Sequence, residues 1–140
     1  MQGLLLCVDD ELMVLNALRD QLHKAYGKQH LIEIAESAEE GLEILDELSE
    51  QGLVPLVVIS DFQMPGMKGD EFLIQARLRF PSVVTVMLSG QVSTAAIERM
   101  HRQACLHSLM GKPWDAQALL ANIDSGLEKL ALLRPLPDRC

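Results

Sequence analysis

The sequence predicts an α/β protein built on one doubly wound sheet of five parallel strands. Short apolar runs rich in Val, Ile and Leu alternate along the chain with longer segments whose apolar residues recur at helical spacing. Within these short runs apolar and polar residues do not alternate, which is typical of strands covered on both faces. Strand–helix alternation with short links implies parallel strands joined by right-handed crossovers.

Length and composition favour a single domain with an ordinary core. The chain has 140 residues, of which 49% are hydrophobic. Its formal net charge is −8 and it has no Lys/Arg cluster, so nucleic acid is not expected as a direct partner. No apolar run has the length of a membrane span, and no signal peptide precedes Asp9-Asp10. Cys7, Cys105 and Cys140 lie outside any metal-ligand spacing and indicate free thiols in a reducing cytoplasm.

Three strands are expected in the first half of the chain. The first, residues 4–8, is followed by helical spacing that ends at Gly27. The second is residues 31–35, after which Ser37 opens a helix with a capping-box pattern. The third, residues 56–60, is an unbroken apolar run. Inward-facing positions expected on the two helices are Leu12, Leu15, Leu18, Leu22 and Tyr26, and then Leu42, Leu45 and Leu48.

The second half supplies two more strands and three helices. A helix ended by Pro81 precedes a fourth strand at residues 83–88. Ser93 caps a helix that leads to a fifth strand at residues 106–110, and a last helix covers about residues 115–133. Inward-facing positions are Phe72, Leu73, Ala76 and Phe80, and then Leu119, Ile123, Leu127 and Leu130.

The predicted architecture is a flavodoxin-like three-layer sandwich with strand order 2-1-3-4-5. In this order the chain reverses direction between strands 1 and 3, so their carboxyl ends flank a crevice. Residues 1–133 form the expected domain. Residues 134–140 contain two prolines, which cannot extend the last helix, and are interpreted as a tail or linker.

Polar residues follow four of the predicted strands, and the topology brings all four strand ends to one crevice. These residues are Asp9, Asp10 and Glu11 after the first strand, Asp61 after the third, Ser89 after the fourth and Lys112 after the fifth. Three carboxylates in one pocket repel one another unless a cation is present. Oxygen ligands with access to water suit Mg²⁺. We therefore predict Asp10 and Asp61 as direct ligands, with Asp9 reaching the metal directly or through water.

Asp61 is the best candidate for a nucleophile, because it stands alone at the end of the central strand. A carboxylate can attack phosphorus to form an acyl phosphate. The Lys112 ammonium would offset charge on the phosphoryl oxygens, and the Ser89 hydroxyl could donate a hydrogen bond to one of them.

Together these motifs resemble the signature set of the receiver domain of two-component response regulators. The set comprises Asp9-Asp10, Asp61 with Met64-Pro65-Gly66, Ser89-Gly90 and Lys112-Pro113-Trp114. The resemblance implies that Asp61 accepts phosphate from a phosphohistidine on a sensor histidine kinase or a histidine phosphotransfer protein, with Mg²⁺ required. It also implies that the main chain of Gln63 binds the metal and that the Lys112-Pro113 bond is cis.

The resemblance further implies a phosphorylation-dependent surface formed by residues 93–104, 106–110 and 115–133. Met100, Leu109 and Trp114 are expected on this surface, which would meet a partner, a second copy of the chain or an output domain beyond it. Leu109 stands where many receivers carry a Tyr or Phe that turns inward on activation. Trp114-Asp115 is interpreted as a packing aromatic followed by a helix cap.

Two other functions remain open at the level of sequence. A phosphatase of the haloacid dehalogenase type also uses a strand-end Asp with Mg²⁺, but it needs a second acid two residues later, where this chain has Gln63. A docking module that never receives phosphate is the other alternative. The preferred interpretation is a signalling switch that is not a turnover enzyme.

Overall fold

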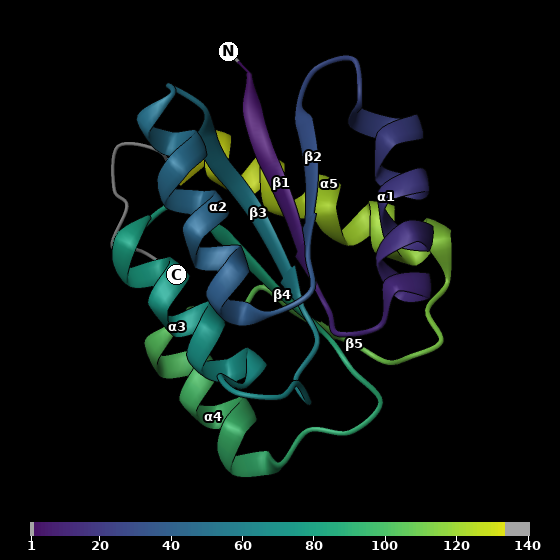
Figure 1. Ribbon diagram of the computed structural model, residues 1–140, viewed down its shortest axis with the longest axis vertical. Coiled ribbons are helices and arrows are strands. Elements are labelled where there is room, and N and C mark those ends of the chain that lie inside the picture. The colour runs from purple at the N-terminus through teal and green to yellow at the C-terminus, as the bar shows by residue number, and fades with distance from the viewer. Residues whose placement is uncertain (1, 134–140) are drawn as a thin grey trace.

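The computed structural model describes residues 2–133, and it confirms the predicted fold class and strand order. Five parallel strands form one sheet in the order β2-β1-β3-β4-β5, and five helices alternate with them along the chain (Figure 1). The strands are β1 (Gly3–Val8), β2 (Leu31–Ala35), β3 (Val54–Ser60), β4 (Val84–Leu88) and β5 (Ser108–Met110). The helices are α1 (Leu12–Tyr26), α2 (Ala38–Glu50), α3 (Gly69–Arg79), α4 (Thr94–Gln103) and α5 (Ala116–Leu133).

The sheet separates two hydrophobic cores. One core joins the strands to α2, α3 and α4 and includes Leu6, Val58 and Phe72. The other joins them to α1 and α5 and includes Leu18 and Ile123. In Figure 1, α5 passes behind the strands while α2 lies in front of them. Because both faces are covered, the central strands consist almost entirely of buried apolar residues, as the unbroken runs predicted.

Two strands differ by two residues from their predicted bounds, for reasons visible in the backbone, while β1 and β4 differ by one residue each. β3 begins two residues early because Val54 and Pro55 already pair with β1, at a point where the register shifts. β5 begins late, at Ser108. The N–H of Leu106 donates instead to the carbonyl of Met100 in α4, so it closes the end of that helix and is not part of the strand.

The predicted helix caps are present. The Ser37 hydroxyl accepts a hydrogen bond from the N–H of Glu40, and the Ser93 hydroxyl accepts one from Ala96. Asp115 caps α5 through a 2.9 Å bond from the N–H of Ala118. These contacts satisfy donors that have no partner within the first turn of a helix.

Three expectations about individual side chains are wrong. Leu12 is 51% exposed, because it lies in the first turn of α1, beyond the edge of the core. Met100 lies on the buried face of α4, is fully buried, and does not contribute to a partner surface. Cys105, which was expected to be a free thiol, takes part in a disulfide bond. The prediction failed because separation along the sequence does not report distance in space. Cys7 is a free, buried thiol as expected, whereas Cys140 and the predicted tail lie outside the described residues.

Truncating Phe72 is expected to be among the most destabilising changes in the core. Its ring is fully buried between α3 and the sheet. Phe72→Ala should lower the free energy of unfolding by about 3–5 kcal/mol, through lost burial and the cavity left behind. Urea denaturation measures this change. The matched control is Leu78→Ala on the same helix, where the side chain is 68% exposed; a comparable loss in this control would contradict the assignment of the core.

Candidate functional site

The structure brings the acids of the first and third strands together at the carboxyl edge of the sheet. Oxygen atoms of Asp9, Asp10 and Asp61 lie within 4.8 Å of one another. Asp9 and Asp61 are buried, while Asp10 is exposed at the rim. The crevice between β1 and β3 therefore holds three carboxylates, as the strand order predicted.

Asp61 is held in place by the neighbouring strand and by its own loop. Its N–H donates to the carbonyl of Val8 in β1 at 2.9 Å. Its Oδ1 accepts from the N–H of Phe62 at 2.8 Å, which leaves Oδ2 facing Lys112. One carboxylate oxygen is thus fixed, and the other is directed toward the charged groups of the crevice.

Lys112, which follows β5, extends its side chain to three acids. Its Nζ lies 2.7 Å from Asp9 Oδ2, 3.4 Å from Asp61 Oδ2 and 3.7 Å from Glu11 Oε1. Burial lowers the pKa of Lys112, but its hydrogen bond to Asp9 and the charges of Asp9 and Asp61 outweigh burial and raise that pKa overall. The lysine is therefore a permanent positive charge in the crevice.

The surroundings of Asp9 disfavour its charged form, although Lys112 lies beside it. Burial raises the pKa of Asp9 most, and the neighbouring charge of Asp61 raises it further, against the opposing hydrogen bonds from Lys112 and the N–H of Glu11. Three carboxylates facing one ammonium are incompletely neutralised. The site thus favours an additional cation.

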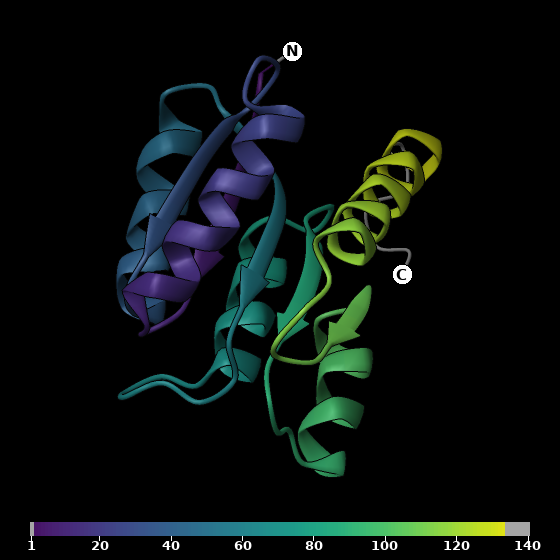
Figure 2. The ribbon, with the colours of Figure 1, turned by 90° about the vertical axis from the view of Figure 1, so that its right-hand side faces the viewer.

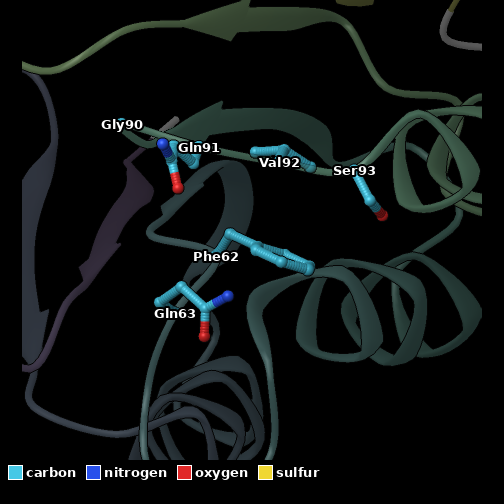
Figure 3. Close-up of a pocket in the computed structure, with 6 residues that line it drawn as sticks. All are labelled: Phe62, Gln63, Gly90, Gln91, Val92 and Ser93. Carbon is cyan, nitrogen blue, oxygen red and sulfur yellow. The ribbon is translucent and has the colours of Figure 1, made fainter.

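Ser89 and Gln63 lie in the loops that follow β4 and β3, at the same edge of the sheet as the carboxylates. The Ser89 hydroxyl is buried and donates to the carbonyl of Gln91 at 3.3 Å, a long bond that a better acceptor could replace. Gln63 is exposed. An open pocket of about 590 Å³ is lined by Phe62 and Gln63 of one loop and by Gly90, Gln91, Val92 and Ser93 of the other (Figure 3).

The donor set suits Mg²⁺. Clustered carboxylate oxygens, one of them on the exposed side chain of Asp10, provide a few hard ligands and leave room for coordinated water. Asp9, Asp10 and Asp61 are the residues that would hold the ion. The Lys112-Pro113 bond beside them is cis, as the resemblance implied.

Gly69 supports the site through close packing, a role that was not predicted from the sequence. A Cβ built at this position would lie 1.9 Å from the carbonyl oxygen of Asp61 and 2.9 Å from the Cα of Phe62. The N–H of Gly69 also donates to the carbonyl of Phe62. The loop between β3 and α3, which projects from the body of the domain in Figure 2, therefore returns to press α3 against the strand end that carries Asp61. A glycine at a helix start is the only signal in the sequence.

Fold and site together define a doubly wound α/β protein with three clustered carboxylates and a lysine at its switch point. The response regulator receiver domain family matches residues 5–124, and the chain belongs to this family. Receiver domains are signalling modules of two-component systems and bind Mg²⁺ at a cluster of aspartates.

The similar proteins include two transcriptional regulators and many receiver structures. The chain is 28% identical to the hydrogenase transcriptional regulatory protein HoxA of Cupriavidus necator, over 94% of this chain and 25% of HoxA. It is 30% identical to the DNA-binding transcriptional regulator NtrC of Klebsiella pneumoniae, over 64% of this chain and 18% of NtrC. The chain thus spans a quarter or less of these relatives. The signal receiver domain of an HD domain-containing protein from Pseudomonas fluorescens Pf-5 shares the fold, with a TM-score of 0.82, 23% identity and coverage of 94% of this chain and 99% of that one.

Helices in residues 2–133 are all too short or too polar to cross a lipid bilayer.

Proposed function

We propose that this receiver domain acts in the cytoplasm as a phosphorylation-dependent switch in which Asp61 accepts the phosphoryl group. The observation that carries the proposal is the convergence of Lys112 with Asp9, Asp10 and Asp61, side chains that follow three different strands, β5, β1 and β3. The donor would be a phosphohistidine on a sensor histidine kinase or a histidine phosphotransfer protein. The switch domain extends over residues 1–133, with residues 134–140 as a tail or linker.

The reaction needs an attacking carboxylate and compensation of charge. Asp61 Oδ2 attacks phosphorus, an O–P bond forms, and the P–N bond breaks with its electron pair leaving on the imidazole. Lys112 and the Ser89 hydroxyl contact the phosphoryl oxygens. Asp9, Asp10, Asp61 and the main chain of Gln63 would hold Mg²⁺, which would supply further neutralising charge.

The added phosphoryl group carries about two negative charges, and its oxygens are new hydrogen-bond acceptors for the loop after β4. Replacing the long bond from Ser89 to Gln91 would move this loop and the α4 helix that follows it. The responsive surface then consists of α4, β5 and α5. It includes Leu109, which is 43% exposed, and the partly buried Trp114. This surface controls a partner, a second copy of the chain or an output domain.

The proposal is tested with the full chain, Mg²⁺ and acetyl phosphate, followed by intact mass. The expected result is one phosphoryl adduct that is absent when EDTA removes the divalent ion. Beryllofluoride should change the fluorescence of Trp114 under the same conditions. Lack of both responses would overturn the switch and favour a docking module.

Asp10→Asn is expected to weaken Mg²⁺ binding by at least about tenfold, equivalent to about 1.4 kcal/mol, because it removes one charged oxygen ligand. Calorimetric titration with Mg²⁺ measures the change. Glu11→Gln is the matched control, because it removes the same charge one residue away, outside the three-carboxylate cluster. Its effect should stay within about fivefold, the range of an exposed ion pair. Equal losses in both variants would show that general charge, and not ligation, governs the affinity.

A further inference from the structure

A side-chain hydrogen bond joins the loop between β5 and α5 to helix α1. The indole Nε1 of Trp114 donates to Oε1 of Gln21 at 2.8 Å. The ring itself packs against the core between α1, α5 and the sheet. Trp114 is the only tryptophan of the chain. A phenylalanine at this position would preserve most of the packing but could not make the hydrogen bond.

The same short loop carries Lys112, two residues before Trp114. At its start, the Met110 carbonyl accepts from the N–H of Ser89, and at its end Asp115 caps α5. Neither contact directs the loop toward α1. A Cβ at Gly111 would meet nothing within 4 Å, so packing does not fix that part of the loop. Among the contacts of the described residues, the Lys112 ion pairs, the packing of the Trp114 ring and its hydrogen bond to Gln21 hold the loop on the α1 side.

The Asp9 carboxylate is hydrogen-bonded to the start of helix α1. The helix begins at Leu12, and the N–H of its N-cap residue, Glu11, donates to Asp9 Oδ1 at 2.9 Å. A bond from the loop to Gln21 therefore ties the backbone of Lys112 to the element that follows Asp9. The 2.7 Å separation between Lys112 Nζ and Asp9 Oδ2 depends on the position of both elements.

We propose that Gln21 and Trp114 are a pair of positioning residues that hold Lys112 at the acidic crevice. This inference rests on the proposed function of the crevice and assigns to these two side chains a role in the rate of phosphoryl transfer to Asp61. Neither residue contacts the carboxylates. They act by limiting the positions available to the lysine, since orientation of a charged group in advance lowers the barrier to reaction.

The test uses Trp114→Phe and Gln21→Leu, which each remove the bond, and Gln21→Glu, which keeps an acceptor oxygen. The rate of phosphorylation by acetyl phosphate is measured by intact mass at saturating Mg²⁺. The first two variants should be slower by about two- to tenfold, the effect of losing one ordinary hydrogen bond. Gln21→Glu should restore most of the rate. Mg²⁺ affinity, measured by calorimetry, should be unchanged in Gln21→Leu, because the ligands are untouched.

A second comparison separates positioning from a general loss of stability. Gln21→Leu is combined with Lys112→Ala, and rates are compared well below the melting temperature of each variant. If the pair acts through Lys112, adding Gln21→Leu to Lys112→Ala should cause no further loss of the phosphorylation rate. Independent, additive losses would overturn the inference, as would wild-type rates in both bond-deficient variants. In both of those cases the wild-type chain is still phosphorylated, so only the positioning role is overturned. If the wild-type chain accepts no phosphoryl group, the proposed function is overturned as well.

Discussion

Asp61→Asn is expected to abolish the phosphoryl adduct formed with acetyl phosphate and Mg²⁺. The amide keeps the shape of the side chain and an oxygen that can accept from the N–H of Phe62, but it cannot attack phosphorus. It also removes one of three crowded carboxylates. The variant should therefore remain folded by circular dichroism while intact mass detects no adduct.

The matched control for this experiment is Asp20→Asn, which changes an exposed aspartate on α1 far along the helix from the crevice. It should accept phosphate at the wild-type rate. An adduct on Asp61→Asn of the same yield as on the wild type would place the acceptor elsewhere. The proposal for Asp61 would then be wrong, although the family and fold would stand.

Gly69→Ala is expected to be the most damaging single-methyl change near the site. The added Cβ would meet the carbonyl oxygen of Asp61 at 1.9 Å and its carbonyl carbon at 2.8 Å. Both atoms are backbone, so α3 and the end of β3 must separate. Overpacking of this kind costs roughly 1–3 kcal/mol, which corresponds to roughly 4 °C in Tm for each kcal/mol.

The same separation should displace Asp61 and slow its phosphorylation by roughly a hundredfold, the effect of a misplacement of about 1 Å. Thermal unfolding and the rate at a temperature where the variant is folded measure the two effects independently. Gly111→Ala is the control, because its Cβ would meet nothing within 4 Å. Retention of wild-type stability and rate by Gly69→Ala would show that the close approach at this glycine is not required.

The two glycines show why part of the site was not predictable. Both stand beside a loop in the sequence, and neither is distinguished by its neighbours there. Only the return of α3 onto the end of β3 makes Gly69 indispensable to the packing. Likewise, Gln21 and Trp114 lie 93 residues apart, and no periodicity relates them.

The sequence by itself determined the layers, the strand order and the four strand ends that supply the crevice. Apolar periodicity is a local property, and the rules for parallel crossovers convert it into a topology with few alternatives. Strand ends could be wrong by two residues, as at Val54 and Ser108, because pairing depends on the partner strand.

Tertiary structure alone decided which side chains near the crevice are buried, exposed or tied together. Met100 and Leu12 follow the same apolar pattern, yet one is buried and the other is half exposed. Their burial depends on what packs over each helix. The contacts of Lys112 with Asp9 and Asp61 and the bond of Trp114 to Gln21 depend on distances of a few ångströms between elements. Such distances are set by how whole helices and strands pack, which a local pattern of residues does not encode.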